Sequence, residues 1–312
     1  MTIIILSGGT GTPKLLNGFN KKKDEFSEKI VVIANTGDDW DFYGLYVSPD
    51  VDAVLYLLSG LLDTDKFWGI KDDSFNAIGS LKKLQEDIWF NLGDKDMGIC
   101  LYRTNLIAND LSLVEVTDKI RKRLRIDFEV YPMSNDSIQT YFNTEKGRFH
   151  LEEFFIKHKN KFEIESVEYV GATTAKVPEE IIKLLKSCNM VIIGPSNPIS
   201  SIGPILYPNF KKELKKINAP IVVISPIIGN KAISGPTKQY LLSLGFESTP
   251  EGIIKFYQDI ADTFIFHESD ENYDLIKKYP EKNLFFENIL FSKEEAVLDF
   301  VDTLLRMKRE KD

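Results

Sequence analysis

The strongest constraint in this 312-residue chain lies at its start, where an apolar run leads directly into a glycine-rich loop. Thr2–Leu6 read TIIIL, which predicts a buried strand, and Ser7–Lys14 read SGGTGTPK. Leu15, Leu16 and Phe19 then suit one face of a helix. A strand, a glycine-rich turn and a helix N-terminus in this order predict a phosphate cradle, because glycines let backbone N–H groups approach an anion and the helix dipole attracts it.

The loop departs from two familiar nucleotide-binding motifs. Gly9 and Gly11 begin like a dinucleotide fingerprint, but Lys14 stands where the third glycine would be. The chain contains no Gly-Lys dipeptide, which excludes a Walker-type loop. A purely structural turn is the remaining alternative. We favour phosphate binding, with the charge of Lys14 beside the turn.

Composition excludes several classes of protein. The formal net charge of −8 argues against a general nucleic-acid binder. Cys100 and Cys188 are the only cysteines, so a disulfide scaffold is not expected and a reducing cytosol is. No apolar run approaches the length of a membrane span, and we expect the N-terminal run to be a strand and not a signal peptide. We expect a cytoplasmic protein that binds neither nucleic acid nor membrane.

Further apolar runs repeat the strand signal along the chain. They are Ile30–Ala34, Phe128–Met133, Met190–Ile193, Ile221–Ile224, Thr263–Phe266 and Leu284–Phe286. The pattern predicts an α/β protein with a Rossmann-like, doubly wound, mostly parallel sheet. We expect residues 1–50 and 127–312 to form this core and 51–126 a mainly helical insertion. Gln139–Phe155 alternates around a turn and predicts a small β-hairpin excursion.

Acidic side chains follow the second predicted strand. Asp38 and Asp39 come just after it, and Asp50 and Asp52 open a helix. Such carboxylates either stabilise the helix dipole or supply oxygen ligands to Mg²⁺, and the sequence leaves both interpretations open. The tip of the strand itself is Asn35, where dinucleotide enzymes usually have an acid, so a nicotinamide enzyme is disfavoured.

Two long loops follow later strands. Gly194–Pro204 and Ser225–Pro236 both exceed the few residues that a simple connection needs. Long loops over a rigid sheet are where binding residues concentrate. Together with the opening loop they predict an extended anionic ligand.

These motifs, taken in order, resemble the 2-phospho-L-lactate transferase family, which makes the deazaflavin coenzyme F-420. The resemblance covers nearly the whole chain and rests on Ser7–Leu15, Asn35–Asp39, Ser48–Asp52, Leu92–Asp96, Met133–Asp136, Gly194–Pro198 and Ser225–Asn230. Lys95 departs from the family pattern, since many members have arginine there. The charge is kept but the bidentate geometry is lost.

The resemblance implies an activity. The enzyme would move a phospholactyl group, or its phosphoenolpyruvyl or phosphoglyceryl analogue, from a guanosine diphosphate-linked donor to the deazaflavin FO and release GMP. It also implies a need for Mg²⁺, a homodimer, and an acceptor site to which the insertion contributes.

The resemblance and the residue chemistry together assign roles to the motifs. The catalytic residues would be Asp50, Asp38 and Lys14, and the metal ligands Asp38, Asp39 and Asp50. The donor and its phosphates would be bound by Gly8, Gly9, Thr10, Gly11, Thr12, Lys14, Ser196, Asn197, Gly229 and Asn230. The deazaflavin would be bound by Asp50, Lys95, Met133 and Ser134.

Two other functions are compatible with a glycine-rich loop after a first strand. One is a nucleotide-sugar-binding regulator of central metabolism, and the other is a sugar-phosphate nucleotidylyltransferase. The aromatic residues of the insertion, Trp68, Phe75 and Trp89, suit a flat ring ligand but also suit a core of the insertion.

Overall fold

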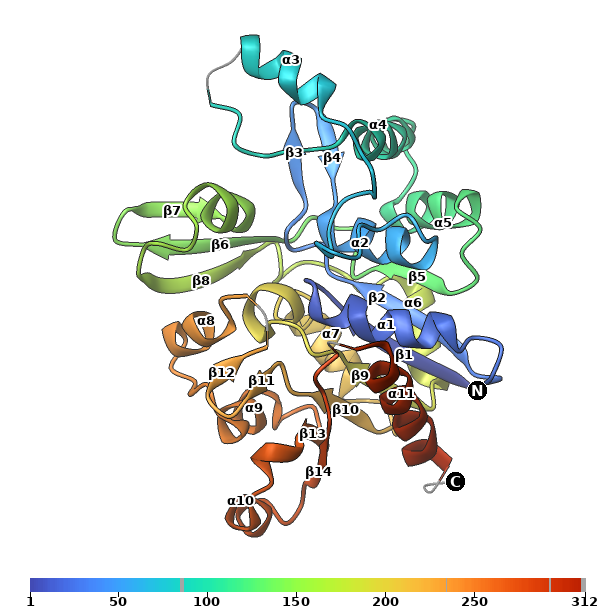
Figure 1. Ribbon diagram of the computed structural model, residues 1–312, viewed down its shortest axis with the longest axis vertical. Coiled ribbons are helices and arrows are strands. Elements are labelled where there is room, and N and C mark those ends of the chain that lie inside the picture. The colour runs from blue at the N-terminus through green and yellow to red at the C-terminus, as the bar shows by residue number, and fades with distance from the viewer. Residues whose placement is uncertain (85–86, 234, 292, 310–312) are drawn as a thin grey trace.

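A computed structural model describes residues 1–84, 87–233, 235–291 and 293–309. Ser234, in the predicted loop Ser225–Pro236, lies outside the described residues. The centre of the fold is a seven-stranded sheet with helices on both faces (Figure 1). None of the described helices combines the length and the apolar character of a membrane-spanning segment.

The central sheet has the strand order β5-β2-β1-β9-β10-β13-β14, and each neighbouring pair is parallel. The bounds are β1 Thr2–Ser7, β2 Lys29–Ala34, β5 Glu129–Pro132, β9 Met190–Ile193, β10 Ile221–Ile224, β13 Thr263–His267 and β14 Asn283–Glu287. The predicted doubly wound α/β sheet is therefore confirmed. The strand order reverses between β1 and β9, and such a switch point is where open parallel sheets bind ligands.

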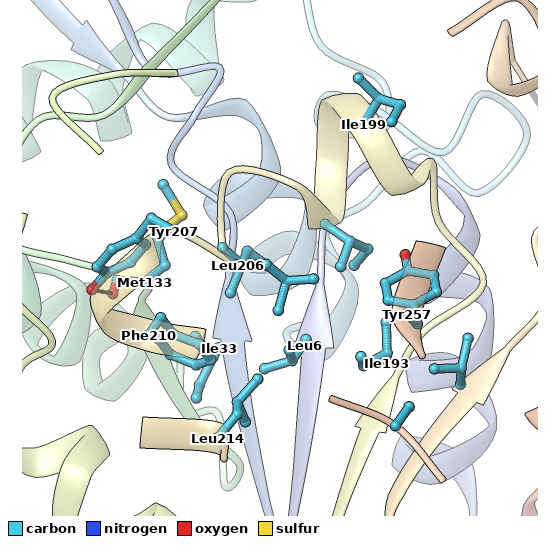
Figure 2. Close-up of a cluster of buried hydrophobic side chains, with 14 of the residues drawn as sticks. Leu6, Ile33, Met133, Ile193, Ile199, Leu206, Tyr207, Phe210, Leu214 and Tyr257 are labelled. Carbon is cyan, nitrogen blue, oxygen red and sulfur yellow. Dashed lines mark hydrogen bonds between the residues drawn. The ribbon is translucent and has the colours of Figure 1, made fainter. Parts of the chain in front are cut away.

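One face of the sheet packs against helices from the second half of the chain. These are α6 Glu179–Ser187, α7 Pro208–Leu214, α8 Thr237–Ser243 and α9 Pro250–Tyr257. Figure 2 shows Leu6, Ile33 and Ile193 of the sheet in the same buried cluster as Phe210 and Leu214 of α7. Because side chains alternate along a strand, the remaining strand residues point to the opposite face.

The opposite face is covered by three helices from the first half of the chain and by its C-terminal helix. They are α1 Gly11–Lys21, α2 Pro49–Leu58, α5 Leu113–Arg123 and α11 Glu294–Arg309. Ile3 and Ile5 of β1 lie here in one cluster with Leu16 of α1, Val54 of α2 and Val301 of α11. The C-terminal helix α11 therefore helps to hold α1, the helix that follows the first glycine loop, on the sheet.

A second, smaller core lies apart from the sheet, at the top of Figure 1. It joins the hairpin β3 Trp40–Phe42 and β4 Leu45–Val47 to α3 Asn76–Leu84 and α4 Asp94–Ala108. The sequence did not predict this hairpin. The expected division at residues 51–126 stays a prediction. Two helices of that range, α2 and α5, pack on the sheet.

A three-stranded antiparallel sheet projects on the left of Figure 1. It contains β6 Gln139–Thr144, β7 Gly147–His150 and β8 Ile164–Val170. The predicted hairpin is confirmed as β6 and β7. Its expected extension to Phe155 is wrong, because the chain turns into the π-helical segment η1 Glu153–Lys157, where Phe154 is buried in the main core.

The remaining elements are short and lie in the second half of the chain. They are η2 Pro198–Ile202, β11 Ile227–Ile228, β12 Lys231–Ala232, η3 Glu268–Asp270 and α10 Tyr273–Lys278. The strands β11 and β12 pair as a hairpin within the second predicted loop.

Candidate active site

A cavity of about 450 Å³ opens at the switch point of the sheet. Gly9, Thr10 and Gly11 line it after β1, and Ser196 and Asn197 line it after β9. Its other walls come from the N-terminal half of α2, the Phe67–Gly69 turn, residues 90–92 with Asp96, the segment after β7 and the start of α8. The cavity therefore unites segments that are widely separated in the sequence.

The loops after β1 and β9 interlock. The Thr12 N–H donates to Ser196 Oγ at 3.0 Å, and the two hydroxyl oxygens lie 2.7 Å apart. A Cβ on Gly11 would lie 1.9 Å from the carbonyl oxygen of Pro195. Only glycine permits this approach, so the contact between the two loops requires glycine at position 11.

Asp50 links the ends of β1, β2 and α2. The Gly9 N–H donates to Asp50 Oδ1 at 2.7 Å, and Asn35 Nδ2 donates to Asp50 Oδ2 at 2.8 Å. Asn35 Oδ1 accepts from the Gly37 N–H at 2.8 Å, which fixes the orientation of the amide. A Cβ on Gly8 would lie 2.9 Å from Asp50 Oδ2, which accounts for the glycine there. The Asp50 carboxylate is thus held in one position at the cavity wall.

Asp38 and Glu152 line the same cavity, as do the carboxylates of Asp52 and Asp96. Asn35 Nδ2 lies 3.4 Å from Asp38 Oδ1, so one amide group lies between Asp38 and Asp50. Burial raises the pKa of Asp50 to about 6, against the opposing hydrogen bonds from Asn35 and Gly9. Burial, and then repulsion from Asp50, raise the pKa of Asp38 well above its usual range and that of Glu152 to about 8. This wall attracts a cation or a hydrogen-bond donor.

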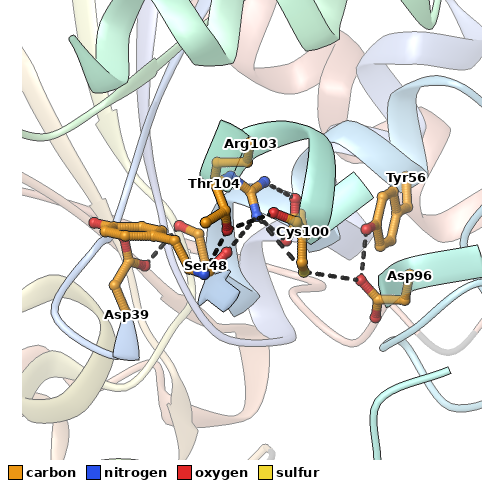
Figure 3. A network of polar contacts seen from close by, with 9 residues as sticks. Asp39, Ser48, Tyr56, Asp96, Cys100, Arg103 and Thr104 are labelled. Atoms are coloured by element: carbon orange, nitrogen blue, oxygen red, sulfur yellow. Dashed lines mark hydrogen bonds and ion pairs between the residues drawn. The ribbon is translucent and has the colours of Figure 1, made fainter. Parts of the chain in front are cut away.

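A buried polar network adjoins this wall (Figure 3), and its Tyr56 and Asp96 also line the cavity. Arg103 of α4 is 0% exposed and forms two hydrogen bonds to the Asp52 carboxylate, one of them 2.9 Å long. Tyr56 Oη donates to Asp96 Oδ1 at 2.7 Å. Burial raises the pKa of Asp96 to about 7. Arg103 supplies a full positive charge to this network, and its ion pair with Asp52 connects α4 to the first turn of α2.

Aromatic side chains form much of the cavity wall. They are Tyr56, Phe67, Trp68, Phe90, Phe155 and Tyr240. Trp68 is half exposed, so this wall reaches the rim. An acidic wall and an aromatic wall in one cavity suit a ligand with a flat ring and hydrogen-bond donors.

The predicted site residues divide into two groups in space. Lining the cavity are Gly9, Thr10, Gly11, Asp38, Asp50, Ser196 and Asn197. Gly8 and Thr12 contact Asp50 and Ser196 from just behind the wall.

Other predicted residues point elsewhere. Asp39 accepts from Tyr46 Oη at 2.8 Å and from Ser48 Oγ at 2.6 Å within the buried network. Lys14 Nζ lies 5.0 Å from the ring centroid of Phe67, outside the lining residues.

The predicted deazaflavin and second-loop residues lie outside the cavity lining too. Lys95 Nζ donates to the Asp72 carbonyl, Met133 is buried in the core, and Ser134 Oγ donates to the Lys176 carbonyl. Gly229 and Asn230 are exposed, and the Gly229 N–H donates to Asp270. Their predicted roles stay predictions.

Sequence reasoning missed Glu152, Arg103 and the role of Asn35. Asn35 carried a signal, since it stands at a strand tip in a polar motif. Glu152 and Arg103 carried none, because one follows a hairpin strand and the other lies inside a helix among apolar and polar residues. Only the tertiary fold brings these side chains to the site.

The carboxylates of Asp38 and Asp50 fit a hard divalent cation. Both are buried oxygen donors on either side of the Asn35 amide, and Asp38 has only the 3.4 Å contact with that amide as a side-chain hydrogen bond in the described chain. Mg²⁺ prefers such carboxylate oxygens together with substrate phosphate. Asp52, Asp96 and Cys100 also gather within 4.8 Å, but Arg103 and Tyr56 already bind the two carboxylates.

Comparison with known proteins gives consistent matches. The model of the family described as 2-phospho-L-lactate transferase CofD matches residues 3–296. A 2-phospho-L-lactate transferase of Methanopyrus kandleri is 40% identical over 275 residues, 87% of each chain. That of Methanocaldococcus jannaschii is 38% identical over 95% of this chain and 94% of its own.

A solved structure shares the fold. It is a protein member of the upf0052 family from Bacillus halodurans, with a TM-score of 0.58 and 19% identity. The alignment covers 96% of this chain and 90% of that one.

Gly11→Ala tests the contact between the two loops. The added methyl group would meet the backbone of Pro195, so we expect a loss of about 1–3 kcal/mol in the free energy of unfolding, measured in urea. Gly98→Ala on α4 is the matched control, because nothing lies within 4 Å of its Cβ position, and it should gain up to about 1 kcal/mol. Equal stability of Gly11→Ala and the wild type would contradict the close approach.

Arg103→Met tests the buried network. Removing the guanidinium leaves Asp52 buried without its cation, so we expect the free energy of unfolding to fall by about 3–5 kcal/mol. Arg123→Met, at the exposed end of α5, should change it by less than about 0.5 kcal/mol. An unchanged melting temperature for Arg103→Met would show that Asp52 does not depend on this partner.

Proposed function

The chain belongs to the 2-phospho-L-lactate transferase family, and from this we propose that it transfers a phospholactyl group from a guanosine diphosphate-linked donor to the deazaflavin FO and releases GMP. Relatives named 2-phospho-L-lactate transferase match most of the chain at 36–40% identity. This favours the transferase over a nucleotide-sugar sensor or a nucleotidylyltransferase.

One observation carries the proposal. A single cavity contains the glycine-rich helix N-terminus, a pair of buried carboxylates and an aromatic wall. The transfer needs these three features: a place for a diphosphate, a means to neutralise its charge, and a surface for the flat deazaflavin ring.

The first-turn backbone of α1 at Thr10 and Gly11, with Ser196 and Asn197 opposite, would position the diphosphate. Asp38 and Asp50 would bind Mg²⁺, which when bound neutralises charge on the phosphate oxygens. Asn35 and Gly9 keep the Asp50 carboxylate in place through its two hydrogen bonds. The deazaflavin ring would lie against aromatic residues such as Trp68, with its ribityl chain toward the acidic wall.

Several finer statements belong to the same proposal. The enzyme would act as a cytoplasmic homodimer. The donor acyl group would be lactyl, with enolpyruvyl and glyceryl as the tested alternatives. Lys14 would leave Phe67 to contact phosphate when the donor binds, since its ammonium group lies next to the cavity wall.

The transfer itself is tested with the full chain, FO and Mg²⁺. We expect GMP release together with a more anionic deazaflavin product for at least one of the three guanosine diphosphate-linked donors, followed by anion-exchange chromatography. Omitting FO, or chelating the metal with EDTA, should abolish both products. No product with any donor would refute the transferase proposal.

Asp50→Asn tests the position of the cation and phosphate. The amide weakens cation binding and turns a donor toward Asn35, so we expect turnover to fall by about 100-fold or more at saturating Mg²⁺. Asp24→Asn, an exposed and otherwise identical substitution, should keep wild-type turnover. Mn²⁺ binding followed by electron paramagnetic resonance should weaken in Asp50→Asn only. Near-normal turnover of Asp50→Asn would remove Asp50 from the site.

A further inference from the structure

Glu152 is a buried ionisable side chain whose carboxyl group has no hydrogen-bond partner among the described residues. Glu152 is 8% exposed and lines the cavity. Within the described chain, no hydrogen bond or ion pair to its carboxylate is present. The same cavity contains Asp50 and Asp52, whose carboxylates each accept two hydrogen bonds.

Burying a carboxyl group without a hydrogen-bond partner is unfavourable, most of all in its ionised form. A group that the fold itself does not satisfy is satisfied by what enters the cavity, and a carboxylate accepts either a hydrogen-bond donor or a cation. Glu152 therefore marks the part of the cavity where the ligand presents one of these.

Glu152 comes from a different segment of the chain than Asp38 and Asp50. Among the described residues, these three side chains do not all lie within 4.8 Å of one another, so they do not form one compact three-ligand set. Asp38 and Asp50 share the Asn35 amide, whereas Glu152 enters from the segment between β7 and η1. Its partner is therefore a hydrogen-bond donor of the ligand, and the donor that the proposed transfer brings into this cavity is the acceptor hydroxyl.

We propose that Glu152 is the general base that receives the proton of the acceptor hydroxyl. The inference rests on the proposed function. The hydroxyl oxygen forms a bond to the phosphorus that carries the lactyl group, and its proton passes to a Glu152 carboxylate oxygen. The bond from that phosphorus to the bridging oxygen breaks, and the electron pair leaves on GMP.

Glu152→Gln tests this role in the full chain with FO, Mg²⁺ and the active donor. The amide still accepts a hydrogen bond but takes up no proton, so kcat should fall by about 10²–10⁴-fold. FO binding by equilibrium dialysis and Mn²⁺ binding by electron paramagnetic resonance should stay within about threefold of the wild type. Both changes in affinity are therefore expected to be at least about tenfold smaller than the loss of kcat. A merely structural role would change binding as well.

Glu153→Gln is the matched control, because the neighbouring carboxylate pairs with Lys157 outside the cavity lining. It should keep wild-type kcat. Glu152→Asp retains a carboxylate and should recover part of the kcat lost in Glu152→Gln, which keeps the test decisive if the amide variant folds poorly.

The outcomes are distinct. An active wild type with an equally active Glu152→Gln variant overturns the inference alone, and so does loss of Mn²⁺ binding in that variant, which would make Glu152 a metal ligand. An inactive wild type overturns the proposed function and this inference with it.

Discussion

The site depends on the two hydrogen bonds that the Asp50 carboxylate accepts from Gly9 and Asn35. They join the loop after β1, the tip of β2 and the first turn of α2 at one point. Gly9 and Asn35 are positioned by the strands that precede them, and α2 is positioned by the packing of its apolar face on the sheet. Asp50 is therefore positioned by the core of the fold and needs no ligand to order it.

The same carboxylate lies among other buried acids, which is unfavourable for the protein alone. Burial raises the pKa of Asp38, Asp39, Asp50, Asp52, Asp96 and Glu152. Arg103 offsets the charge of Asp52, whereas among the described residues Asp38 has only a 3.4 Å contact with Asn35 and Glu152 has no side-chain partner. A bound cation or hydrogen-bond donor would relieve the repulsion between these carboxylates. Buried acids with raised pKa values in a cavity are typical of a functional site.

The fold was largely predictable because its signals are local. Seven apolar runs predicted the seven strands of the central sheet, and the glycine-rich loop predicted the first strand–helix turn. The rule that ligands meet the carboxyl ends of parallel strands also directed attention to Asp38, Asp50 and Ser196, which share one cavity. Which side of a strand-end motif faces the cavity is decided by packing, so Asp39 lies in the network behind Asp38 although the two are adjacent.

Glu152 and Arg103 show where such reasoning ends. Glu152 reaches the cavity because the chain turns into η1 after β7, and Arg103 reaches Asp52 because α4 packs on the β3–β4 hairpin and α5. Both side chains reach parts of the chain that are distant in the sequence, and such placements leave no periodic signal in it. Met133, likewise, is buried in the core, where Tyr207 Oη donates to its carbonyl at 3.2 Å.

A crystal structure of the full chain with Mg²⁺, FO and a non-hydrolysable analogue of the guanosine diphosphate-linked donor tests the account most directly. We predict the diphosphate beside Thr10, Gly11 and Ser196, with a metal ion about 2.0–2.1 Å from a carboxylate oxygen of Asp38 or Asp50. The terminal ribityl hydroxyl should lie within hydrogen-bond distance of Glu152. A donor bound outside this cavity, or a metal ion away from both aspartates, would contradict the account.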